Sequence, residues 1–262
     1  MKKTLLVLLL VSFAVLSATA AFAEAKDTLV SVTADYWMPG IDAEVKSSEL
    51  GLLGSQIDII DDLGIDDSET IPALKASLDL PLFPEIIVSY FAIDGDGKKN
   101  ITKTLSYKGV SYAASTNVTA SYEITHYEGL LAWSFLNQDF GKLGVVLGVK
   151  YFEVETSLKD NTTGITKTED VAGPVPVVGI IGGIGLPGKF RFEALARGLV
   201  LEVGDVDAAL FDIDAGLHYD FNKFFRASAG YRYFAIDAED TKENDTVDIK
   251  FTGPYIGITG SF

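Results

Sequence analysis

Residues Phe225–Tyr233 of the chain read FRASAGYRY, and this stretch is the clearest guide to the fold. Aromatic residues and alanine occupy every second position, whereas Arg226, Ser228 and Arg232 lie between them. Successive side chains of a β-strand point to opposite faces of the sheet. The alternation therefore predicts a strand with one apolar and one polar face.

The same period of two recurs along most of the chain and predicts ten strands. Their polar faces carry glycine, small residues and charges of both signs, whereas the water-facing side of a soluble sandwich is usually dense in Lys and Glu. Small and oppositely charged residues suit a confined lumen. We therefore predict an all-β, transmembrane, antiparallel up-and-down β-barrel, most simply of ten strands, with eight or twelve as alternatives. The predicted strands are 29–38, 71–80, 85–93, 124–135, 143–152, 175–185, 190–200, 206–219, 225–233 and 255–262.

Composition agrees with this prediction. The 262 residues carry a net charge of −16, yet 48% are apolar and the mean hydropathy is +0.25. A chain that is both acidic and apolar must segregate the two kinds of residue. There is no cysteine, which excludes disulfides and thiol chemistry. No apolar run after residue 23 is long enough to predict a transmembrane helix.

The N-terminus, MKKTLLVLLLVSFAVLSATAAFA, has the pattern of a secretory signal peptide. Lys2 and Lys3 precede an apolar core that is short for a membrane span, and Ala21-Phe22-Ala23 forms a cleavage site. We expect residues 1–23 to be removed, which leaves residues 24–262 as the barrel domain. Loss of the two lysines takes the net charge from −16 to −18.

The connections between the predicted strands differ on the two sides of the barrel. Those at 81–84, 136–142, 186–189 and 220–224 are short. Those at 39–70, 94–116, 156–174 and 237–246 are long, although the one near 201–205 is short. Aromatic residues gather near both ends of the apolar bands. Short turns on one side, long loops on the other and two aromatic girdles are typical of outer-membrane barrels.

A signal peptide, an even number of strands and a last strand ending at Phe262 together resemble bacterial outer-membrane β-barrel proteins, particularly the small OmpW-type and OmpA-type barrels. The resemblance covers residues 24–262 and implies an outer-membrane location, among lipid and lipopolysaccharide. It also implies that Ile256, Ile258 and Phe262 form the signal read by the barrel-assembly machinery, with periplasmic chaperones as transient partners. Gly260 departs from the bulky residue often found in that signal. We expect no nucleic-acid partner and no peptidoglycan-binding domain.

Charged residues of both signs share the predicted lumen. They either form an ion-pair network that fills the barrel or line a charged constriction that selects solutes. Apolar residues on the same face, such as Phe91 and Leu130, favour a narrow or blocked lumen. The charged residues are Asp35, Asp79, Glu128, Lys150, Arg191, Glu193, Arg197, Asp212, Asp214, Arg226 and Arg232.

The stretch 57–69, IDIIDDLGIDDSE, concentrates six carboxylates in the first long connection. It lacks the alternate acids and the central glycine of an EF-hand loop. We expect a compact loop that packs its apolar residues on the barrel mouth and turns its acids outward. The alternative is a weak divalent-cation site formed by Asp61, Asp62, Asp66 and Asp67.

Neither histidine predicts an active site. His126 and His218 both fall on polar faces, and Glu128 stands where lipid A deacylase barrels carry a serine beside their histidine. We expect no catalytic residue and no cofactor. The first hypothesis for function is a narrow passive channel for small solutes with an acidic external mouth. The alternatives are a closed structural or surface-interaction barrel and, less favoured, a lipid-modifying enzyme of the outer membrane.

Overall fold

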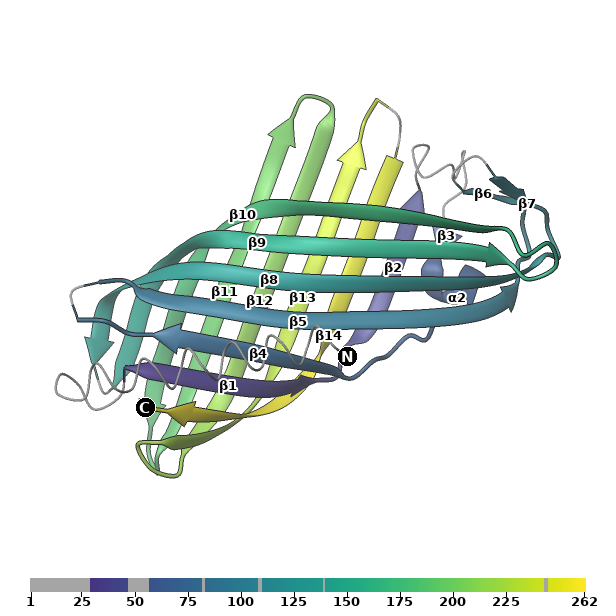
Figure 1. Cartoon of the computed structure of the whole chain (residues 1–262). Helices are drawn as coiled ribbons and strands as arrows, with labels where there is room; N and C mark the ends of the chain where they lie inside the picture. Colours follow the sequence, from purple (N-terminus) through teal and green to yellow (C-terminus); the bar gives the residue numbers. More distant parts are fainter. Residues whose placement is uncertain (1–28, 47–56, 82, 108–109, 139, 243–244) are drawn as a thin grey trace.

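The computed structural model describes residues 29–46, 57–81, 83–107, 110–138, 140–242 and 245–262. In this part of the chain, ten antiparallel strands close into a barrel (Figure 1). The predicted fold class and strand number are therefore confirmed. The predicted signal peptide, residues 1–23, lies outside the described residues. No helix among the described residues is long and apolar enough to cross a membrane.

The barrel strands are paired in sequence order, and the last strand pairs with the first. Shorter elements lie in the first two external connections: β2 (Gly40–Lys46), β3 (Ile57–Asp58), α2 (Ile59–Leu63), β6 (Leu105–Tyr107) and β7 (Val110–Tyr112). The barrel strands are β1 (Val30–Trp37), β4 (Ile71–Leu78), β5 (Glu85–Asn100), β8 (Asn117–Gln138), β9 (Gly141–Asp160), β10 (Thr166–Leu186), β11 (Phe190–Val203), β12 (Val206–Asp220), β13 (Phe225–Asp240) and β14 (Asp245–Ser261).

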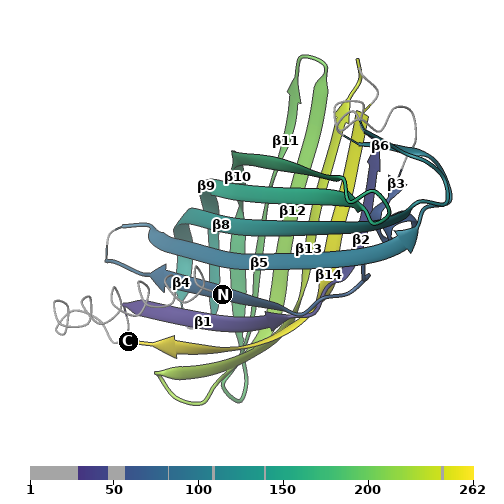
Figure 2. The same cartoon turned by 45° about the vertical axis from the view of Figure 1, so that its right-hand side comes forward.

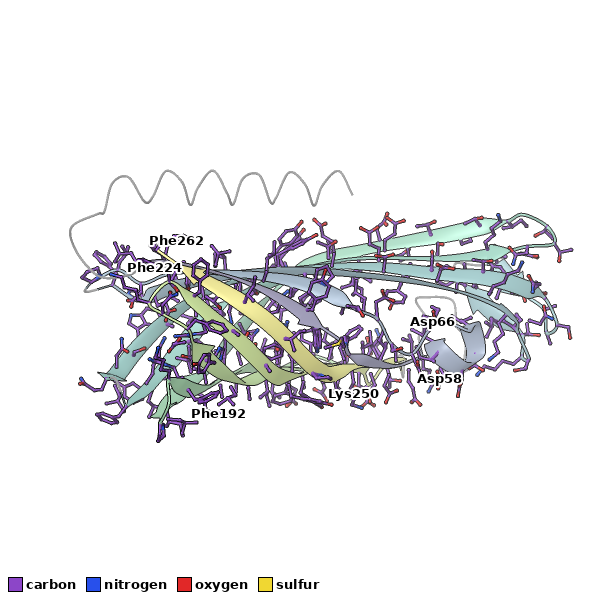
Figure 3. All side chains as sticks on the ribbon, turned by 90° about the horizontal axis from the view of Figure 1, so that it is seen from below. Asp58, Asp66, Phe192, Phe224, Lys250 and Phe262 are labelled. Atoms are coloured by element: carbon purple, nitrogen blue, oxygen red, sulfur yellow. The ribbon has the colours of Figure 1, made fainter. Side chains whose placement is uncertain are left out.

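The two ends of the barrel differ in composition. Phe262, Phe224 and Phe192 lie toward the end with the short turns, whereas Asp58 and Asp66 lie at the opposite end (Figure 3). The barrel also closes beside Phe262, because its backbone oxygen accepts hydrogen bonds from the amides of Leu29 and Val30 at 2.7 and 3.0 Å. In the topology of outer-membrane barrels the short-turn end faces the periplasm.

The apolar face of the strands changes sides along the barrel. In β9, Leu147 is 51% exposed on the outer surface, whereas the neighbouring Lys150 is fully buried in the lumen. Beyond Tyr151 the outward positions are the acidic Glu153 and Glu155, and Leu158 is buried inside. Since lipid accepts apolar side chains and water accepts carboxylates, the change at Tyr151 marks the level where the barrel leaves the membrane. Tyr90, Tyr127 and Tyr151 lie side by side at this level.

Two of the four long external loops predicted from the sequence are wrong. Residues 156–174 are mostly strand, because β9 continues to Asp160 and β10 begins at Thr166. Residues 237–240 and 245–246 are likewise strand, and a turn begins at residues 241–242. The apolar face moves from the outside to the inside at the membrane level, so a pattern sought for membrane strands stops there although the strands continue.

The acidic stretch forms part of the barrel wall. β4 begins at Ile71, so no barrel strand separates β2 from β5 on the external side. Residues 57–69 fill this gap: β3 pairs with β2, and Ile65 forms an isolated bridge with Gly97 of β5. A side chain at Gly97 would collide with the backbone of Gly64 and Ile65. Gly64 itself has a φ of 74° and ends α2, a conformation that favours glycine.

Candidate functional site

Five charged side chains from five strands meet inside the barrel. Lys150 Nζ lies 2.6 Å from Glu128 Oε1 and 2.7 Å from Asp212 Oδ2. Arg197 contacts the same two carboxylates, at 2.6 and 2.8 Å. Arg232 donates to both Asp212 oxygens, at 3.0 and 2.8 Å. None of the five is more than 8% exposed. We call Glu128, Lys150, Arg197, Asp212 and Arg232 the central cluster.

Aromatic rings complete the central cluster. The guanidinium of Arg232 lies 4.8 Å from the ring centroid of Trp37 and 5.1 Å from that of Phe91. Lys150 Nζ lies 5.7 Å from the ring of Phe234. His126 stacks on Phe91 at a centroid distance of 4.4 Å. Such cation–π contacts stabilise cations that have lost their water.

The central cluster connects strands that are not neighbours in the barrel wall. The pair of Glu128 and Arg197 joins β8 to β11, and the pair of Lys150 and Asp212 joins β9 to β12. Three cations surround two carboxylates, and each carboxylate contacts at least two of these cations. Burial of charges is costly unless partners and hydrogen bonds compensate them, and here both are present.

The structure divides the predicted lumen charges into separate groups. It brings together Glu128, Lys150, Arg197, Asp212 and Arg232 in the central cluster. Asp214 instead accepts a hydrogen bond from the Tyr255 hydroxyl at 2.7 Å.

Arg191, Glu193 and Arg226 lie toward the short-turn end, apart from the central cluster. Arg226 Nη1 is 3.5 Å and Arg191 Nε 3.6 Å from Glu193 Oε1. Trp37 and Phe234 were not among the candidate site residues. Their inward position could have been read from strand alternation, but their contacts with the cations could not.

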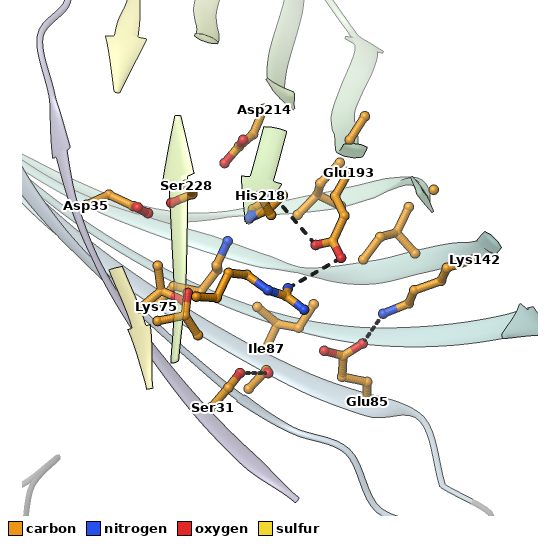
Figure 4. A pocket seen from close by; sticks show the side chains of 18 of the residues that line it. Ser31, Asp35, Lys75, Glu85, Ile87, Lys142, Glu193, Asp214, His218 and Ser228 are labelled. Carbon is orange, nitrogen blue, oxygen red and sulfur yellow. Dashed lines mark hydrogen bonds and ion pairs between the residues drawn. The ribbon is translucent and has the colours of Figure 1, made fainter. Parts of the chain in front are cut away.

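A polar cavity of about 180 Å³ lies on the short-turn side of the central cluster. Figure 4 shows side chains that line this cavity. Lys142 and Glu85 pair at 2.6 Å on its wall, and His218 Nε2 lies 3.8 Å from Glu193. Asp35 Oδ1, His218 Nδ1 and Ser228 Oγ are buried around it without a hydrogen-bond partner among the described protein groups. Such a lining suits water or a small polar solute.

An apolar cavity of about 390 Å³ lies on the external side of the central cluster. Its wall comes from β2, β6, β8, β9, β10, β13, β14 and residues 59–65. A void of about 30 Å³ lies against the central cluster, and Glu128, Arg197 and Arg232 line it. The small void adjoins the polar cavity, whereas the apolar cavity shares no lining residue with either of them. The central cluster and its aromatic rings occupy the lumen between the polar and the apolar cavity.

The four aspartates of the proposed cation site have different surroundings. Asp62 Oδ2 accepts a hydrogen bond from the Asp58 amide at 3.1 Å and lies 2.6 Å from Lys103 Nζ. Asp61, Asp66 and Asp67 are exposed. Within the described ranges, no group of three or more His, Cys, Asp or Glu side chains is placed to hold a metal ion.

The three residues of the proposed assembly signal share the outer face of the barrel. Ile256, Ile258 and Phe262 are 58%, 69% and 50% exposed, respectively. Gly260 pairs with Val32 on one side and Phe225 on the other. The side chains of Ile256, Ile258 and Phe262 are therefore positioned to contact lipid or another protein.

No family model matches the chain, and no curated protein matches it by sequence. The outer-membrane protease OmpT of Escherichia coli has a similar structure, with a TM-score of 0.53 and 10% identity, over 88% of this chain and 97% of that chain. The chain has the fold of a bacterial outer-membrane β-barrel.

Two other solved barrels match with TM-scores below 0.5. Ail of Yersinia pestis matches with a TM-score of 0.33 and 11% identity, over 88% of this chain and 99% of that chain. The toluene transporter TodX of Pseudomonas putida matches with a TM-score of 0.35 and 9% identity, over 90% of each chain. At these identities the comparisons establish the fold alone, and the OmpW-type resemblance stays a prediction.

Proposed function

We propose that the chain is an outer-membrane barrel that is closed to ions and solutes and acts through its external half. The observation that carries this proposal is the central cluster, which separates the polar cavity from the apolar cavity. The void beside it, of about 30 Å³, has room for about two water molecules. A hydrated ion would have to displace paired, buried charges in order to pass.

The narrow channel predicted from the sequence remains the second candidate, because a polar cavity lies on the short-turn side. Opening a path would require the central cluster to rearrange. Removing one partner from a buried ion pair costs about 3–5 kcal/mol, so we expect an open state to be rare.

We also propose that the barrel has no catalytic activity. The chain contains only two histidines. His126 is fully buried beside the central cluster, with its Nε2 atom 3.3 Å from Lys150 Nζ. His218 faces the polar cavity, where Glu193 is its neighbour. In the part of the chain that the structure describes, neither imidazole adjoins both a serine and a substrate-sized opening on the external side, as an enzyme acting on outer-leaflet lipid would require.

We place the protein in the outer membrane, exported by residues 1–23 and inserted by the barrel-assembly machinery through Ile256, Ile258 and Phe262. The exposed positions of these three side chains support the proposal. Deleting Phe262 should leave unassembled protein in the periplasm, as measured by fractionation and heat-modifiable migration. A normal yield of folded barrel in the membrane would contradict the assembly role.

Conductance in planar bilayers tests the closed barrel directly. We expect no stepwise ion current from the wild-type protein. The double variant Glu128→Ala/Arg197→Ala removes a matched pair of opposite charges and should produce measurable conductance. A control, Glu193→Ala/Arg226→Ala, removes a partly exposed pair outside the central cluster and should show no conductance. Stable, porin-sized current steps from the wild-type protein would refute the proposal.

A further inference from the structure

The apolar cavity is larger than packing defects usually are. Protein interiors contain few voids bigger than a water molecule, yet this one measures about 390 Å³, which is within the range of small-molecule pockets. Isoleucine, leucine and valine side chains dominate its wall, among them Ile41, Leu158 and Ile249. The hydroxyl of Tyr107 at its margin already has a partner, Thr156 Oγ1, at 2.9 Å. The lining therefore favours an occupant that needs few hydrogen bonds.

The barrel wall beside this cavity is not closed by hydrogen bonds. β10 pairs with β11 only from Leu186 to Val178, although both strands continue beyond that point within the described chain. Beyond it, β11 and β12 turn away from β10 (Figures 1 and 2). β10 still pairs with β9 through Pro174 and Pro176. Proline has no amide hydrogen to donate, so these two positions, which have the same parity, cannot donate to a strand on the other edge of β10.

Apolar side chains are exposed along the unpaired edges of β10 and β11, which we call the seam. Val171 of β10 lines the cavity and is 59% exposed. Leu201 of β11, on the same face as the inward Arg197, is 46% exposed. The seam begins at Val178, which lies below the level of Tyr151, because Tyr151 pairs with Pro174. It therefore extends from the outer part of the membrane band into the external half.

Charge restricts what the cavity can accept. Glu169 lines it, and Glu153 and Glu155 lie on the neighbouring external surface. The chain as a whole carries a net charge of −16. A carboxylate ligand would have to lose water close to these acids, and this costs more in a partly enclosed space than in bulk water. A neutral molecule avoids that cost.

We propose that the apolar cavity binds a neutral, mainly aliphatic molecule, which reaches it between the free edges of β10 and β11. The molecule is either a free compound or an acyl chain from the outer leaflet, since the two share the same chemistry. This inference goes beyond the closed barrel and does not depend on it, because the cavity and the seam lie on one side of the central cluster.

Methyl NMR of the barrel in lipid nanodiscs, titrated with 1-octanol, tests the binding site. We expect saturable shifts of the Ile41 and Ile249 methyl groups, which line the cavity. The lipid-facing Ile213 and Ile258 should move linearly and slightly, because they report octanol dissolved in the bilayer. Octanoate should bind at least about tenfold more weakly than 1-octanol. Linear shifts at all four methyl groups would overturn the proposal.

Two cavity-filling variants make the binding test independent of any single substitution. Ala43→Phe and Ala120→Phe both place a ring in the cavity and should abolish saturation. Ala196→Phe adds the same ring on the outer face, opposite in parity to Arg197, and should leave saturation unchanged. Retained saturation in a folded cavity variant would refute the site.

Nanodiscs with a nitroxide on the lipid acyl chain distinguish the two sources. If lipid fills the cavity, the Ile41 and Ile249 signals broaden before octanol is added and recover as octanol displaces the chain. If the occupant is a free compound, only Ile213 and Ile258 broaden. Either pattern supports apolar binding when octanol saturates the cavity.

Charges placed in the seam test the route. Val171→Arg and Leu201→Arg should each slow octanol exchange about tenfold, as read from NMR line shapes, because an apolar molecule must pass a solvated cation. Val206→Arg, at an exposed position near the external turn, is the matched control. Unchanged exchange in both seam variants would show that the molecule enters elsewhere.

Discussion

Asp212 is the residue on which the central cluster depends most. It is fully buried, and Lys150, Arg197 and Arg232 all reach its carboxylate within 3.0 Å. Without it, Glu128 is the only carboxylate of the central cluster facing three buried cations. A buried charge without its partner keeps its desolvation cost and loses the compensation.

Replacing Asp212 by Ala should therefore lower the free energy of unfolding by about 3–5 kcal/mol. Urea titration of the folded barrel in lipid-like micelles measures this loss. Glu193→Gln is the matched control, since Glu193 is one-third exposed, and it should change the stability by about 0–1 kcal/mol. Equal effects of the two substitutions would show that the buried ion pairs of the central cluster do not contribute to the free energy of unfolding.

Sequence alternation placed Lys150 correctly on the lumen side but gave no indication of its environment. A lumen residue in a water-filled pore tolerates substitution, whereas Lys150 is fully buried against two carboxylates. The difference arises from residues on strands far apart in the sequence, such as Asp212. Period-two patterns assign a face, and barrel closure decides which residues meet across it.

Gly97 allows the acidic stretch 57–69 to lie against β5. Gly97→Val should displace Ile65 from its bridge, loosen residues 57–69 and speed their cleavage by an added protease. Gly129→Val is the control, because a side chain at Gly129 meets no atom within 4 Å. Wild-type cleavage rates in the Gly97 variant would mean that the stretch does not need this close approach.

At the scale of strands, the sequence predicted which face of each segment meets lipid. Leu147→Arg near the middle of the membrane band should cost about 2–4 kcal/mol of unfolding free energy, because the guanidinium would lie in hydrocarbon. Leu147→Phe keeps the position apolar and should be nearly neutral. Urea titration in lipid vesicles compares them. A mild effect of the arginine would contradict the assignment of this face.

The external extensions of the strands were missed for a physical reason. Residues 153–158 of β9 still alternate, but with acids outside and apolar residues inside. An apolar interior above the membrane is the arrangement of a soluble barrel, and a search for lipid-facing apolar residues stops at Tyr151. The reversal itself was present in the sequence and could have been used to place the membrane boundary.

The turn after β9 should respond to acid. Asp160 Oδ1 accepts hydrogen bonds from the Thr162 and Thr163 amides at 2.7 and 3.1 Å, and these donors lower the pKa of Asp160 below its ordinary value. A lowered pKa stabilises the turn above the pKa of the unfolded chain, and this contribution is lost as the pH falls through the folded pKa.

We therefore expect the amides of Thr162 and Thr163 to lose their hydrogen-bonded NMR shifts only at acid pH. Asp160→Asn keeps an acceptor oxygen without a titrating proton and should remove the pH dependence. A transition at the same pH in the asparagine variant would assign it to another group.

At the scale of the whole molecule, ten strands and their order could be predicted because each strand carries its own pattern. The division of the lumen could not, because it depends on Glu128, Arg197 and Asp212 meeting from different strands. The seam between β10 and β11 could be predicted only in part. Pro174 and Pro176 were visible in the sequence, but the end of pairing at Val178 became evident only in the closed barrel.

The measurement that tests the divided lumen most directly is the labelling of single cysteines, since the native chain has none. Thr156→Cys lines the apolar cavity, and Ser31→Cys lines the polar cavity. A positively charged, membrane-impermeant thiol reagent is added to vesicles that hold the barrel with its external side outward. The account predicts labelling of Cys at position 156 and none at position 31 until the vesicles are opened. Equal labelling of both positions from outside would contradict it.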